Sequence, residues 1–89
     1  MKLKVTEEIW KEGGMYVSYC PELDVASCGE SAEQAKENLH EAILITIEET
    51  QKMGTFDQFI QEAGFEVVQK DTLAVRRELV GFEPVEIGI

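Results

Sequence analysis

Apolar residues recur at helical spacing in the middle of the chain. Ser31 precedes this stretch and Gln34 lies three residues after Ser31, which is the spacing of a capping box at a helix N-terminus. The polar residues in between fall largely on the opposite side of a helix. Gly54 can end the helix. The pattern therefore predicts one long amphipathic helix from about Ala32 to Lys52, with an apolar stripe of Ala35, Leu39, Ala42, Ile43 and Ile47.

Before this helix, apolar and polar residues alternate with a period near two, which is typical of strands. A turn at Glu12-Gly13-Gly14 and a second turn at Pro21 divide the alternating region. Within the middle strand, Met15, Val17 and Tyr19 fall on one face, and Tyr16, Ser18 and Cys20 fall on the other. We expect three antiparallel strands over Leu3–Trp10, Met15–Cys20 and Val25–Cys28.

Two further elements follow the long helix. Thr55 suits the N-cap of a short second helix, with Gln58 at the capping-box position and Gly64 as its end. Phe65–Gln69 reads as a strand that runs parallel beside the first strand, because a crossover through helices favours that pairing. The pattern predicts an α+β fold in a single domain of residues 1–89: a three-stranded antiparallel meander, a long helix, a short helix and a further strand.

The last twenty residues are less regular. Periodicity leaves Leu73–Val80 open between a strand and a short helical turn. Val85–Ile89 alternates like a strand after Pro84, and an unpaired apolar strand is an aggregation hazard. We expect residues 82–89 to pair with a neighbouring subunit of a homo-oligomer or to cover the edge of their own sheet.

Several short motifs, in order and with consistent spacing, resemble the HicB-like antitoxin family over roughly the first 50 residues. They are Glu12-Gly13-Gly14-Met15-Tyr16-Val17, Pro21-Glu22-Leu23, Gly29-Glu30-Ser31, Glu33-Gln34-Ala35, Asn38-Leu39 and Glu41-Ala42-Ile43. The resemblance implies a partial ribonuclease-H-like layer that binds a small basic ribonuclease toxin of the HicA type. Longer members carry a C-terminal DNA-binding module. Only Lys70, Arg76 and Arg77 are basic after Lys52, so operator binding is not expected here.

Charge supports the same class of partner. The chain has 18 acidic and 8 basic residues and a formal net charge of −10. Nucleic-acid backbones require clustered Lys and Arg, so direct nucleic-acid binding is not expected. A basic protein is favoured, although the acids could serve solubility alone. The start of the chain turns acidic before any long apolar run, and no run approaches membrane-spanning length, so we expect a cytoplasmic protein without membrane contact.

The sequence offers no set of catalytic or metal-binding residues at a useful spacing. Cys20 and Cys28 lack the spacing of a zinc or redox pair, and His40 falls mid-helix without a nucleophile placed beside it. A ribonuclease-H-like fold raises the possibility of a metal-dependent nuclease using Glu7, Glu41 and Asp71. That enzyme stands third, after an antitoxin-like binding module and a homo-oligomeric scaffold or regulatory binding protein. We expect no enzyme activity and no cofactor.

The expected partner-binding edge lies on the first hairpin and its neighbouring loop. Tyrosine and tryptophan are favoured anchors at protein interfaces. The loop from Pro21 to Asp24 adds two acids beside the aromatic residues. The hypothesis assigns this edge to Tyr16, Tyr19, Glu22 and Asp24.

Overall fold

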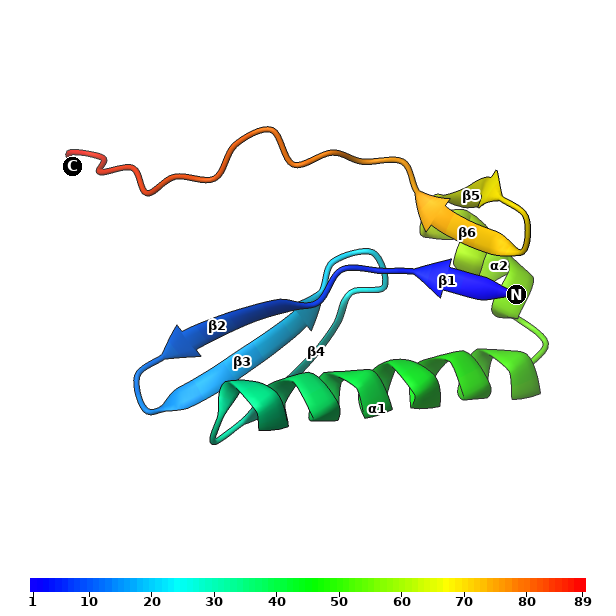
Figure 1. Cartoon of the computed structure of the whole chain (residues 1–89), viewed down its shortest axis with the longest axis horizontal. Helices are drawn as coiled ribbons and strands as arrows, with labels where there is room; N and C mark the ends of the chain where they lie inside the picture. Colours follow the sequence, from blue (N-terminus) through cyan, green and yellow to red (C-terminus); the bar gives the residue numbers. More distant parts are fainter.

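The computed structural model describes all 89 residues and has a mixed α+β architecture, with two small sheets and two helices (Figure 1). Neither helix is both long enough and apolar enough to span a membrane. The strands are β1 (Lys2–Lys4), β2 (Glu8–Glu12), β3 (Met15–Cys20), β4 (Val25–Gly29), β5 (Phe65–Gln69) and β6 (Thr72–Val75), and the helices are α1 (Ala32–Lys52) and α2 (Phe56–Glu62).

Strands β2, β3 and β4 form the predicted antiparallel meander. Trp10 on β2 pairs with Val17 on β3, and Val17 pairs with Cys28 on β4. Two tight turns connect the strands. Gly13 has a φ of +59° in the first turn and Asp24 has a φ of +53° in the second, a region that glycine and aspartate tolerate better than most residues.

Helix α1 begins and ends at the predicted residues. The Ser31 hydroxyl accepts a hydrogen bond from the Gln34 backbone N–H at 3.0 Å, and the Gln34 side chain accepts one from the Glu30 N–H at 2.6 Å. The helix runs along one side of the meander and reaches α2 at the far end of the molecule (Figure 1). Its apolar stripe supplies two members of the core cluster of Cys20, Leu23, Leu39, Ile43, Ile60 and Phe65.

The second sheet has the order β1-β6-β5, and it corrects two predictions. The predicted first strand is broken, because residues 5–7 separate β1 from β2. The predicted parallel pairing of Phe65–Gln69 with the first strand is wrong. A turn at Lys70-Asp71, where Asp71 has a φ of +59°, sends the chain back as β6, which pairs antiparallel with β5 and parallel with β1.

Residues 76–89 form an extended tail with no helix or strand. Its only backbone–backbone hydrogen bond runs from the Arg77 N–H to the Val75 carbonyl. The sequence pattern leaves Leu73–Val80 undecided between a strand and a helical turn. In the structure, only its first residues belong to a strand, β6 (Thr72–Val75). Within one chain, residues 82–89 do not cover a sheet edge by backbone pairing. Their pairing with a neighbouring subunit stays a prediction.

Candidate functional site

The meander has one covered face and one open face. On β3, Ser18 and Cys20 point toward α1 and are fully buried. The Ser18 hydroxyl donates a hydrogen bond to the Ala35 carbonyl of α1 at 2.7 Å, which fixes the helix on this face. Because side chains alternate along a strand, Val17 and Tyr19 lie on the opposite face, away from the helix.

Cross-strand partners extend this open face over all three strands. Trp10 and Cys28 flank Val17, while Glu8 and Ala26 flank Tyr19. Trp10 is 43% exposed and Met15 is 42% exposed, although both are large apolar side chains. We call this surface the outer face; it consists of Glu8, Trp10, Glu12, Met15, Val17, Tyr19, Ala26 and Cys28.

The turn between β3 and β4 adds an acid to one end of the outer face. The Tyr19 hydroxyl donates a hydrogen bond to Asp24 Oδ1 at 2.7 Å. This hydrogen bond, helped by burial and by the nearby negative charges, raises the pKa of Tyr19 above 10.0. Two of the predicted binding residues therefore form one unit, a half-buried tyrosine whose hydroxyl is held by an exposed carboxylate.

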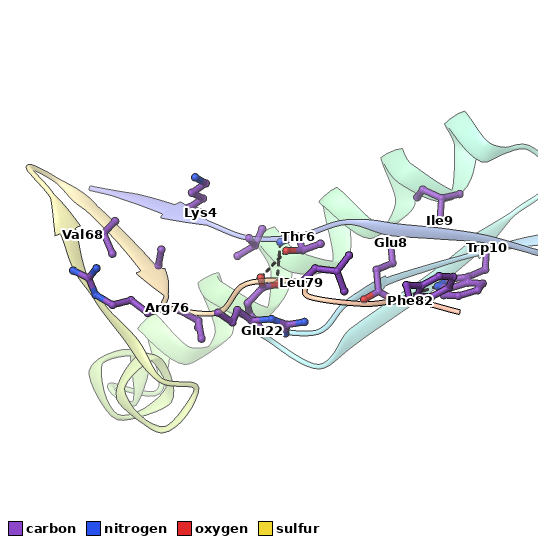
Figure 2. Close-up of a pocket in the computed structure, with 14 residues that line it drawn as sticks. Lys4, Thr6, Glu8, Ile9, Trp10, Glu22, Val68, Arg76, Leu79 and Phe82 are labelled. Carbon is purple, nitrogen blue, oxygen red and sulfur yellow. Dashed lines mark hydrogen bonds between the residues drawn. The ribbon is translucent and has the colours of Figure 1, made fainter. Parts of the chain in front are cut away.

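Glu22, in the same turn, has an internal partner. Its carboxylate accepts hydrogen bonds from the Thr6 N–H at 2.9 Å and from the Thr6 hydroxyl at 2.7 Å (Figure 2). Partial burial raises the pKa of this carboxyl, but the Thr6 hydrogen bonds oppose it, and the net pKa lies below 4.5. Glu22 therefore ties the β3–β4 turn to the segment between β1 and β2.

Tyr16 lies apart from the other three predicted residues. By alternation it shares the helix-facing side of β3 with Ser18 and Cys20, whereas Tyr19 is on the outer face. The ammonium group of Lys11 lies 5.8 Å from the centre of the Tyr16 ring. The structure thus brings Tyr19 and Asp24 together with Glu22 nearby, and leaves Tyr16 on the other side of the sheet.

The predicted edge lacks several residues of the outer face. The sequence pattern places Trp10 only at the end of the predicted first strand, and Met15 and Val17 only on one face of the next strand. The signal that identifies them is the strand register, which places Trp10 directly beside Val17. Glu8 and Glu12 follow from the same alternation on β2.

A groove separates the start of the tail from the rest of the molecule. It has a volume of about 750 Å³ and runs beside the segment that joins β1 to β2 (Figure 2). Phe82 of the tail contacts Trp10, with the ring centroids 5.3 Å apart. Its charged lining residues are Lys4, Arg76, Arg77, Glu8 and Glu22, and Arg76 also forms an ion pair with Glu66. The apolar lining includes Val5, Ile9, Trp10, Val75, Leu79 and Phe82.

The remaining reactive groups do not gather into a site. No group of three or more His, Cys, Asp or Glu side chains is placed to hold a metal ion. Cys20 is buried, which raises the pKa of its thiol, and Cys28 is an exposed free thiol. His40 is exposed on α1. It lines a pocket of about 290 Å³ that also contains Glu7, whose Oε2 is buried without a hydrogen-bond partner.

The arrangement offers an exposed aromatic and apolar face with acidic groups at its margin, carried on a sheet whose other face is held by a helix. Aromatic and apolar side chains of this kind are typical of protein interfaces, and acidic groups at the margin attract basic groups. Comparisons with protein-family models, curated proteins and solved structures found no match.

Proposed function

We propose that this chain is an antitoxin-like protein-binding module of the cytoplasm that neutralises a small basic ribonuclease toxin of the HicA type. Two independent lines support the proposal. The motifs around the meander and the start of α1 resemble the HicB-like family. The outer face has the chemistry expected of a surface that binds a basic protein.

The composition of the outer face carries the proposal. Large side chains that stay exposed in the folded chain, such as Trp10 and Met15, gain from burial against a partner. Aromatic residues and methionine are enriched at interface cores, and Trp and Tyr are frequent energetic anchors. Tyr19 is fixed by its hydrogen bond to Asp24, so less side-chain freedom is lost on binding.

Charge supplies selectivity for the partner. Glu8, Glu12 and Asp24 border the apolar centre, and no Lys or Arg belongs to the outer face. A net charge of −10 attracts a basic protein over a longer range and raises the rate of encounter. Added salt screens this attraction, so binding should weaken as the ionic strength rises.

Inhibition in this proposal is steric, and the chain performs no chemistry on the toxin. A sheet braced by α1 presents a preformed surface, so the toxin meets a fixed shape. A bound module of this size covers the RNA-binding surface of a similarly small enzyme. The acidic outer face also takes the place of the RNA phosphates for which the toxin's basic groups are suited.

The test is affinity capture of the tagged chain from its native cytoplasm at low salt, in parallel with two variants. Trp10→Lys introduces a lysine on the outer face. Glu62→Lys introduces a lysine on α2, outside the outer face, and serves as the control. The proposal predicts a stoichiometric small basic protein with the wild type and with Glu62→Lys, lost with Trp10→Lys and released as salt rises. Recovery of the chain alone would contradict the proposal and favour the alternative function, a homo-oligomeric scaffold.

A further inference from the structure

The tail carries apolar side chains that its own chain leaves in solvent. Leu79, Val80, Phe82, Val85 and Ile87 are between 71% and 94% exposed. From Glu78 onward the tail makes no backbone–backbone hydrogen bond, so its donors and acceptors are also unpaired by the chain. An extended apolar segment of this kind is a template for adding a strand to another sheet.

The strand register indicates how much of the tail lies alongside β2 of its own chain. Lys2 pairs with Thr72 and Lys4 pairs with Ala74, so the parallel offset is 70 residues. Continued along β2, this offset brings Phe82 beside Glu12, the last residue of that strand. The contact of Phe82 with Trp10 agrees to within two residues. Residues 83–89 therefore extend past the end of β2, as the end of the tail does in Figure 1.

The overhang has a regular apolar pattern of its own. Val85, Ile87 and Ile89 alternate with Glu86 and Gly88 after Pro84, so their side chains would share one face of an extended strand. The first part of the tail already contacts its own chain, because Leu79 and Phe82 line the groove together with Trp10. The overhang therefore carries an apolar strand face beyond these contacts.

The surface of the whole chain indicates a partner of substantial area. The accessible surface is 7001 Å², against about 5,200 Å² expected for a folded monomer of this mass. The radius of gyration is 15.3 Å, against about 12 Å for a compact chain of this length. The excess of about 1,800 Å² per chain is in the range that stable dimers bury.

We propose that Pro84–Ile89 adds as an edge strand to a second copy of this chain, in a two-fold symmetric exchange of tails. The acceptor is the groove between β2 and the chain's own tail. The tail forms no backbone hydrogen bond with β2, so the outer edge of this strand can pair with a second copy, and Val5, Ile9 and Trp10 provide apolar contacts. The same chain supplies both the donor segment and the acceptor edge, so two copies satisfy each other and the assembly closes.

The mass of the assembly in solution tests the exchange, measured by light scattering on purified protein. Three variants are compared with the wild type: a chain ending at Glu83, Ile87→Glu, and Val67→Glu. Val67 is also a largely exposed β-branched residue, 67% against 80% for Ile87, but it lies on β5 outside the tail and serves as the matched control. Circular dichroism checks that each variant is folded.

The exchange predicts twice the 10.0 kDa chain mass for the wild type and for Val67→Glu. Truncation and Ile87→Glu should each halve the mass. A monomeric wild type, a dimer that survives truncation, or an assembly larger than two would each overturn the exchange. The tail exchange does not depend on the antitoxin proposal. The mass of the purified chain tests the exchange, whereas capture of a basic protein tests the antitoxin function.

Discussion

At the scale of single residues, two neighbouring acids have different roles. Glu22 and Asp24 look equivalent in the sequence, but Glu22 accepts hydrogen bonds from Thr6, whereas Asp24 accepts one from the hydroxyl of the half-buried Tyr19. The difference arises from the break between β1 and β2, which brings the Thr6 backbone within reach of the turn. Glu22 therefore contributes first to stability, and Asp24 is the better candidate for contact with a partner.

The role of Glu22 predicts a pH-dependent loss of stability in Glu22→Gln. The pKa of Glu22 is lower in the folded chain than its ordinary value of 4.5. Its carboxylate therefore stabilises the fold above about pH 4.5, and this contribution is lost as the pH falls through the folded-state pKa. We expect the variant to be less stable by about 1 kcal/mol at neutral pH, with the difference disappearing in acid. Urea unfolding of the variant and the wild type, at neutral and at acidic pH, measures this difference in stability. An exposed control, Glu12→Gln, should behave like the wild type; a constant difference at all pH values would contradict the account.

Gly29 is required by the close approach of β4 to α1. An added Cβ would lie 2.7 Å from the Ala35 backbone nitrogen and 3.0 Å from Gln34, and neither neighbour is a flexible side-chain end. Gly29→Ala should therefore lower the free energy of unfolding by about 1–3 kcal/mol. Gly14→Ala is the matched control, because nothing lies within 4 Å of its added Cβ. Equal midpoints for the two variants in thermal unfolding would argue against this packing.

At the scale of elements, the parts with strong local signals were predicted well. The bounds of α1 and β3 agree to the residue, because a cap, an apolar stripe and turn residues mark their ends. The order of the second sheet was not predictable in this way. It depends on a turn at Lys70-Asp71 that lacks glycine and proline, and on a three-residue strand, β1, that is too short to show alternation.

The candidate surface was predicted only in part for a related reason. Composition located the aromatic residues of the hairpin, and alternation on β3 separated Tyr16 from Tyr19. The sequence alone did not indicate which face of the meander the helix covers. The hydrogen bond from Ser18 to the Ala35 carbonyl shows that α1 covers the Ser18 face of β3. Trp10 and Val17 therefore lie on the uncovered face.

The two predicted helix caps provide a test at this scale. Ser31 makes its capping hydrogen bond to Gln34, whereas Thr55 makes no side-chain cap bond to α2. Ser31→Ala should cost about 1 kcal/mol of stability and Thr55→Ala only a few tenths. Urea unfolding of the two variants distinguishes them. A larger loss for Thr55→Ala would mean that the cap of α1 contributes less than its geometry indicates.

At the scale of the whole molecule, the chain is open for its size. Only ten of its 89 residues are buried, and most of these join α1 to the two sheets. The outer face and the tail lie outside this core and remain exposed. Such a molecule has little stability to spare and much surface for association. The proposed toxin contact and the proposed tail exchange meet at Trp10, which belongs to the outer face and also lines the groove beside β2.

The most direct test of the central claim is RNA cleavage by the captured basic protein, measured while the purified chain is titrated into it. We predict that cleavage falls to background at a stoichiometric amount of the wild type. Trp10→Lys should require a large excess, whereas Glu62→Lys should inhibit like the wild type. Cleavage that is unaffected by the wild type, or inhibited equally by Trp10→Lys, would contradict neutralisation through the outer face.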